Sequence, residues 1–143
     1  MPAVKRSLKG MPVTFLGQLR GAELAAAYAG FDLFVHTGTE ETFGQTIQEA
    51  HASGLPVVAP RSGGPKDLVQ HGKNGFLFEP DNDIDFRALI QLTVDDAGLR
   101  IRMGEAGRRS VLSRSWSATC EELLGYYRQV IGSRALAVTE KVS

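Results

Sequence analysis

Short runs of consecutive apolar residues alternate, along the first half of the chain, with segments whose apolar residues recur at helical spacing. Strands that are apolar at consecutive positions are typical of a parallel sheet covered on both faces. Four runs predict such strands: 13–16, 31–36, 56–59 and 75–78. Three segments between them predict helices: 23–28, 42–52 and 65–70. This alternation with short connections predicts a doubly wound α/β fold.

The second half of the chain is expected to be helical. Apolar positions at helical spacing predict helices over 83–95, 99–113 and about 116–134. In the last of these, the stripe consists of Trp116, Cys120, Leu123, Tyr127 and Val130. Residues 1–12 are expected to form a partly disordered leader, residues 13–134 one partial domain, and residues 135–143 a frayed tail.

Composition narrows the classes of function. The chain has 143 residues, which suits one domain, and 16 basic residues balance 16 acidic ones. Because there is no excess of positive charge, a nucleic-acid partner is not expected. The one cysteine, Cys120, excludes an internal disulfide and the usual zinc–cysteine clusters. No apolar stretch has the length of a signal peptide core or a transmembrane helix.

The helix expected from Thr42 follows the strand at 31–36, so its N-terminus should lie at the carboxyl edge of the sheet. Ligands of open α/β sheets bind at that edge. Thr42 and Gln45 have capping-box spacing, which predicts Thr42 as the N-cap. The N–H groups of residues 43–46 would then lack helical partners and favour a phosphate. Gly44 would allow a ligand to approach closely.

Two carboxylates, Glu41 and Glu49, stand eight positions apart around this helix start. An ionised carboxylate only accepts hydrogen bonds, so beside a diphosphate both should contact neutral groups, such as sugar or ribose hydroxyls. The simpler alternative is a capped helix with two solvated glutamates, since charged residues mostly lie on the surface.

The segment from Glu41 to Glu49, continuing as EAHASGLPVVA, resembles the E-x7-E signature of retaining GT-B glycosyltransferases of the family-4 type (glycosyl transferases group 1). The resemblance continues through 62–69, Gly72 and 74–77, and includes 13–17 and 32–35 upstream. It covers about residues 12–131 and implies the C-terminal half of a GT-B fold, with an incomplete Rossmann-like parallel sheet and a helical C-terminal segment.

The resemblance implies a role for each matching position. Glu41 and the backbone of Phe43 and Gly44 would hold the donor sugar. His36 is a further candidate for a contact with that sugar, because it ends the predicted strand beside this site. The amides of Gln45 and Thr46 would bind the diphosphate, and Glu49 would bind the ribose. The family's reaction is usually described as a front-face transfer, so the two glutamates are not expected to act as a glycosidase-type acid/base pair.

The residues ETFGQTIQEA, together with Gly-Gly-Pro-x-Asp-Leu-Val, resemble more narrowly the bacterial GDP-mannose-dependent α-mannosyltransferases. The implied donor is a nucleotide sugar, GDP-mannose, and the implied acceptor is a lipid or a glycan. No cofactor and no metal are expected, because the nucleotide sugar is a substrate. A cytoplasmic location is expected, with peripheral contact at the inner face of the cell membrane.

The family's glycine-rich loop and its Arg/Lys pair, which grip the diphosphate, have no counterpart before Val13, so the catalytic residues stay unassigned. The isolated chain is therefore expected to transfer sugar poorly without the missing N-terminal GT-B half. Without the family's first two strands, the strands at Val13 and Phe31 should be separated, with exposed edges. A non-catalytic nucleotide-sugar-binding module that needs a partner chain is the main alternative. Another GT-B enzyme, such as a nucleotide-sugar epimerase, is less compatible with the Glu41–Glu49 spacing.

Other polar positions give weaker signals. Gly63 and Gly64 would form either a ligand loop or a turn into the next helix. Arg61 and Lys66 flank that loop, and we expect each to be a solvated surface residue in preference to a phosphate ligand. We expect the basic residues between Arg100 and Arg114 to form a solvated helix face; the alternative is a surface that attracts anionic lipid. The three histidines are too scattered for a metal motif.

Overall fold

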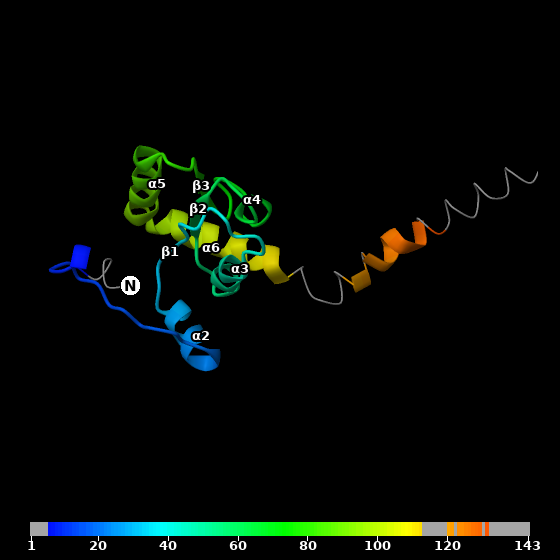
Figure 1. Cartoon of the computed structure of the whole chain (residues 1–143), viewed down its shortest axis with the longest axis horizontal. Helices are drawn as coiled ribbons and strands as arrows, with labels where there is room; N and C mark the ends of the chain where they lie inside the picture. Colours follow the sequence, from blue (N-terminus) through cyan, green and yellow to red (C-terminus); the bar gives the residue numbers. More distant parts are fainter. Residues whose placement is uncertain (1–5, 113–119, 122, 130, 132–143) are drawn as a thin grey trace, which may run out of the picture.

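A three-stranded parallel sheet forms the centre of the protein, in a computed structural model that describes residues 6–112, 120–121, 123–129 and 131. Its order is β1 (Phe34–Val35), β2 (Val57–Pro60) and β3 (Gly75–Phe78), with Phe34 opposite Val57 and Val57 opposite Gly75. Helices alternate with these strands along the chain (Figure 1). The predicted α/β class, with a parallel sheet, is confirmed.

Consecutive residues of β2 point to opposite faces of the sheet, which explains why the whole strand is apolar and buried. Val57 and Ala59 join one buried cluster, whereas Val58 joins the other. The same alternation holds in β3, where Leu77 faces the first cluster and Phe76 and Phe78 face the second. The continuous apolar runs therefore reflect a sheet that is covered on both faces.

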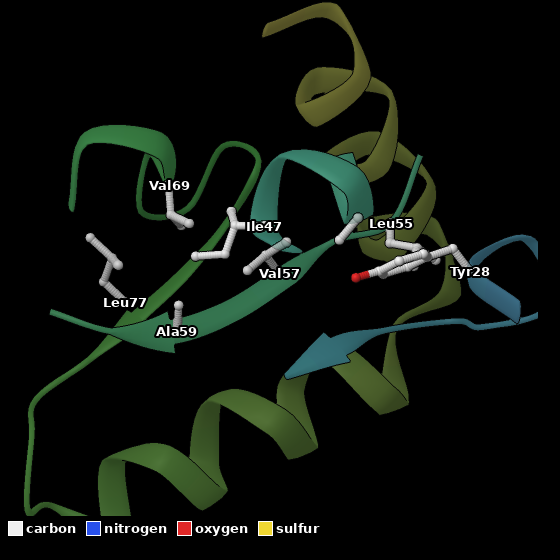
Figure 2. Close-up of a cluster of buried hydrophobic side chains, with 8 residues drawn as sticks. Tyr28, Ile47, Leu55, Val57, Ala59, Val69 and Leu77 are labelled. Atoms are coloured by element: carbon white, nitrogen blue, oxygen red, sulfur yellow. The ribbon is translucent and has the colours of Figure 1, made fainter. Parts of the chain in front are cut away.

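The first face is covered by α2 (Gly21–Ala29), α3 (Gln45–Ala52) and α4 (Pro65–Leu68). Tyr28 enters this cluster from α2 and packs with Ile47 and Leu55 (Figure 2). Pro65 is the first residue of α4, as expected for a proline that has no N–H to lose there.

The second face is covered by α5 (Asp83–Asp95) and α6 (Ala97–Leu112). The side chain of Asn82 caps α5 by accepting a hydrogen bond of 3.1 Å from the N–H of Asp85. The predicted bounds of α5 are confirmed, and α6 begins two residues earlier than predicted. Of the predicted helix 116–134, the described residues (120–121, 123–129 and 131) are helical, and the rest lie outside the described residues.

The prediction of a buried strand over 13–16 is wrong. These residues are extended but belong to no strand, and Phe15 is 46% exposed. β1 is also shorter than the predicted 31–36, and in the described part of the chain it pairs only with β2. A strand without a neighbour cannot form its ladder of hydrogen bonds, so the apolar run alone does not produce one.

None of the described helices has both the length and the apolar character needed to cross a lipid bilayer.

Candidate functional site

The N-terminus of α3 is organised by Glu41 and not by Thr42. One carboxylate oxygen of Glu41 accepts hydrogen bonds from the N–H groups of Phe43 (3.0 Å) and Gly44 (2.9 Å). The N-cap residue is Gly44, in the left-handed conformation with φ of 61°, and no side chain caps it. The predicted Thr42 N-cap is therefore wrong, because the left-handed turn at Gly44 starts the helix two residues later.

These hydrogen bonds determine the charge of Glu41. The amides of Gly44 and then Phe43 stabilise the ionised form and lower the pKa of the carboxyl group, and His36 acts in the same direction. Glu41 is therefore ionised at neutral pH. Its second oxygen makes no hydrogen bond within the described residues, which leaves it available to a hydroxyl donor.

The next two amides remain available. The N–H of Ile47 already donates to the carbonyl of Gly44 (3.1 Å), so the helix ladder begins there. For the amides of Gln45 and Thr46, no hydrogen bond is present in the part of the chain that the structure describes, and both residues are exposed. The four predicted free donors are thus reduced to two, at the positive end of the helix dipole.

Glu49 lies one helical turn further along α3 and has a partner that the sequence did not reveal. The hydroxyl of Tyr28 lies 3.3 Å from Oε2 of Glu49 and 3.4 Å from the carbonyl oxygen of Thr46. Burial raises the pKa of Tyr28 to about 12, with the charge of Glu49 and this hydrogen bond adding to the effect. Tyr28 is therefore a neutral donor at physiological pH.

The loop of Gly63 and Gly64 packs directly against the segment that carries Glu41. The N–H of Gly64 donates to the carbonyl of Glu41 (2.8 Å). A Cβ atom at Gly63 would lie 2.5 Å from that same carbonyl oxygen, and one at Gly64 would lie 2.6 Å from the carbonyl oxygen of Thr42. Both positions thus need glycine so that the loop can pack against the segment of Glu41. The sequence predicted a ligand loop or a turn at Gly63 and Gly64, but not this support of Glu41.

His36 and Glu41 line one hollow of about 430 Å³ at the carboxyl end of β1, together with residues 37–40. Nε2 of His36 is buried and has no hydrogen-bond partner among the described residues. A second hollow, of about 720 Å³, is lined by Phe43, Gln45, Glu49 and residues of α4 and α6. The predicted site residues therefore lie together around the start of α3.

Arg61 and the other two histidines take other positions. Arg61 forms an ion pair of 2.6 Å with Glu79, and His71 accepts a hydrogen bond from the N–H of Leu77. His51 is buried between α3 and α6. Among the described side chains, no three His, Cys, Asp or Glu residues are grouped so that they could hold a metal ion.

The sequence does not indicate Tyr28 as a site residue. Its aromatic ring in an alanine-rich helical segment is the available signal, because a large residue there must pack against something. The pairing with Glu49 required the tertiary structure, since the two residues are 21 positions apart.

This chain is similar to known proteins both in sequence and in structure. The chain is 51% identical over 123 residues to the GDP-mannose-dependent alpha-mannosyltransferase of Mycolicibacterium smegmatis, covering 85% of this chain and 32% of that protein. It is 47% identical over 133 residues to the protein of that name from Mycobacterium tuberculosis, covering 90% of this chain and 34% of that protein. The chain thus spans about a third of the length of these relatives.

Solved structures give the same architecture. Sucrose-phosphate synthase from Thermosynechococcus elongatus matches with a TM-score of 0.78 and 29% identity, covering 92% of this chain and 33% of that one. Anabaena HepE in complex with UDP-glucose matches with a TM-score of 0.72 and 27% identity, covering 90% of this chain and 36% of that one. The family model of the glycosyl transferases group 1 matches residues 5–110. The chain belongs to this family, as the C-terminal part of a GT-B glycosyltransferase.

Proposed function

We propose that this chain is the donor-binding part of a glycosyltransferase that takes a hexose from a nucleotide sugar. The observation that carries the proposal is a pair of amides at the start of α3, those of Gln45 and Thr46, that have no hydrogen-bond partner among the described residues. Glu41 lies before them and Glu49 after them. A helix N-terminus with free N–H groups favours phosphate. Carboxylates on either side of it can accept hydrogen bonds from hydroxyl groups. A nucleoside-diphosphate sugar carries such groups at both ends, on the sugar and on the ribose.

In this arrangement each residue has one chemical task. The amides of Gln45 and Thr46 bind the diphosphate, and Glu49 accepts hydrogen bonds from the ribose. Glu41 accepts hydrogen bonds from the donor sugar through the oxygen that the Phe43 and Gly44 amides leave free. His36, which lines the same hollow as Glu41, offers a further contact to that sugar.

We propose GDP-mannose as the donor, with retention of configuration and a lipid or glycan as the acceptor. Support for the donor comes from the names of three relatives with 42–51% identity, all GDP-mannose-dependent alpha-mannosyltransferases. More distant structural neighbours contain UDP and glucose, which supports the coarser class of nucleotide sugars.

We expect these 143 residues to bind a donor more readily than they transfer its sugar, because they correspond to about a third of the relatives' length. The second candidate is therefore a non-catalytic nucleotide-sugar-binding module or subunit that works with a partner chain. The exposed apolar side chains of Val13, Phe15 and Leu16 support this second candidate, since they offer a surface that a partner chain could cover.

Titration calorimetry with GDP-mannose, GDP and UDP-glucose tests the proposal. We expect GDP-mannose to bind, UDP-glucose to bind more weakly, and Glu49→Ala to lose affinity for both guanosine ligands. A failure of all three ligands to bind would contradict the proposed site. A mannosyl-transfer assay then separates the two candidates, since full turnover by the isolated chain would exclude the non-catalytic one.

A further inference from the structure

We propose that the hydroxyl of Tyr28 is a positioning group that holds the carboxylate of Glu49 in the orientation needed to accept the ribose hydroxyls. This inference rests on the proposed function, and it adds to the site a residue from α2, outside the segment 41–49. It makes Tyr28 a determinant of how strongly the site distinguishes a ribonucleotide from a nucleotide without ribose hydroxyls.

The ring of Tyr28 is firmly placed. Tyr28 is only 6% exposed, and its ring packs against those of Phe31, at a centroid distance of 6.1 Å, and Phe34, at 5.7 Å. In Figure 2 the ring lies within the buried cluster, with its oxygen at the end farthest from the α2 ribbon. A ring held on several sides fixes the position of its hydroxyl, since only the C–O torsion remains free.

The hydroxyl faces two acceptors that belong to successive turns of α3. It lies 3.4 Å from the carbonyl of Thr46 and 3.3 Å from Oε2 of Glu49. Thr46 is one of the two residues whose amides are proposed to bind the diphosphate. The single hydroxyl hydrogen is shared between these two acceptors, so the phenol lies between the helix turn under the phosphates and the carboxylate beyond it, and this sets the position of Glu49 relative to those amides.

The carboxylate of Glu49 keeps most of its capacity for a ligand. A carboxylate has about four acceptor positions, and the Tyr28 hydroxyl occupies one of them, on Oε2. The remaining positions can accept the hydrogen bonds of a vicinal diol. Since Glu49 is only partly buried, without Tyr28 its side chain would sample several rotamers and would lose entropy on binding the ribose.

A purely structural role for Tyr28 makes a different prediction. If the tyrosine only fills the cluster of Figure 2, then Tyr28→Phe, which keeps the ring, leaves every nucleotide affinity unchanged. If the hydroxyl positions Glu49, the same substitution weakens only those ligands that carry ribose hydroxyls.

The experiment compares GDP with 2′,3′-dideoxy-GDP by calorimetry on the full chain. The proteins are the wild type, Tyr28→Phe, Glu49→Gln and the double variant, with Tyr127→Phe as the matched control because Tyr127 is exposed. We expect Tyr28→Phe to weaken GDP binding roughly five- to tenfold, the size expected for the usual net contribution of one hydrogen bond, and to leave the dideoxy ligand unchanged. In the Glu49→Gln background, the additional effect of Tyr28→Phe should be much smaller.

Two results would overturn the inference in distinguishable ways. If the wild type prefers GDP and Glu49→Gln removes that preference, but Tyr28→Phe keeps it, the inference fails and the proposed function stands. If the wild type binds both ligands equally, or neither of them, the proposed ribose site fails together with the inference. Thermal unfolding of each variant shows whether a loss of affinity reflects a loss of fold.

Discussion

Gly107 of α6 lies directly against the imidazole ring of His51 of α3. A Cβ atom at Gly107 would clash with Nδ1 of His51 and would lie 3.0 Å from its Cγ atom. The neighbouring turn of α6 is equally close, since a Cβ atom at Gly104 would clash with the carbonyl oxygen of Gly54. Two glycines one turn apart therefore allow α6 to pack closely against the C-terminal end of α3.

Replacing Gly107 with alanine should destabilise the protein. Because the added methyl group has to displace the His51 ring, we expect a loss of about 1–3 kcal/mol in the free energy of unfolding, the usual cost of overpacking. Gly125→Ala is the control, because nothing lies within 4 Å of its added Cβ atom and alanine favours a helix. Equal stability of both variants in urea denaturation would contradict the close contact.

His51 should make stability depend on pH. Burial lowers the pKa of this histidine, and neither buried ring nitrogen is in hydrogen-bonding geometry with any described residue. The unfolded chain therefore binds a proton more readily than the folded one. The stability that depends on neutral His51 is complete above the unfolded value of about 6.5 and is lost as the pH falls below it.

His51→Leu should reduce this dependence. Above pH 7 we expect a change within about 1.5 kcal/mol, since an apolar residue of similar volume replaces a polar ring without hydrogen bonds. Urea denaturation at a series of pH values measures the effect. The difference between wild type and variant should change as the pH falls below about 6.5, and a constant difference would disprove the assignment.

Glu41→Ala should separate sugar binding from phosphate binding. The substitution removes the proposed acceptor for the donor sugar, so we expect GDP-mannose to bind roughly tenfold more weakly. Affinity for GDP should stay equal or increase, because a negative charge disappears and the amides of Phe43 and Gly44 become free for an anion. Glu23→Ala is the control, with no change expected, because Glu23 is an exposed residue of α2 outside both hollows. A parallel loss of GDP affinity in Glu41→Ala would show that Glu41 acts only by holding the loop.

Gly44→Ala should destabilise the start of α3 more than Gly54→Ala destabilises its end. Both glycines have a left-handed backbone, with φ of 61° and 78°, which costs an alanine roughly 1–2 kcal/mol. Only at Gly44 does the new Cβ atom also meet a side chain, that of Leu68 in α4, whereas it has open space at Gly54. Thermal unfolding should therefore show the lower midpoint for Gly44→Ala, and equal midpoints would contradict the contact between α3 and α4.

The sequence alone predicted the parallel α/β class, the strands at 56–59 and 75–78 to within one residue, and the helix over 83–95. These elements depend on local pattern: consecutive apolar residues for a covered strand, and an asparagine cap for α5. The resemblance of the segment from Glu41 to Glu49 to a glycosyltransferase signature also predicted a site at the start of α3, and the structure brings these residues together there.

Only the tertiary structure decided three features: which apolar runs pair as strands, where α3 begins, and which residues from different elements meet at the site. The run at 13–16 has the composition of a strand, yet a strand forms only by pairing in a sheet, and in the described chain this run is not one of the three paired strands. Thr42 has the spacing of a capping box, yet the left-handed Gly44 shifts the helix start and Glu41 takes the preceding amides. Tyr28 meets Glu49 because α2 packs on α3, and the Gly63–Gly64 loop supports Glu41 through backbone contact. Local pattern determines which element forms, whereas the groups that share a site are determined by how those elements pack.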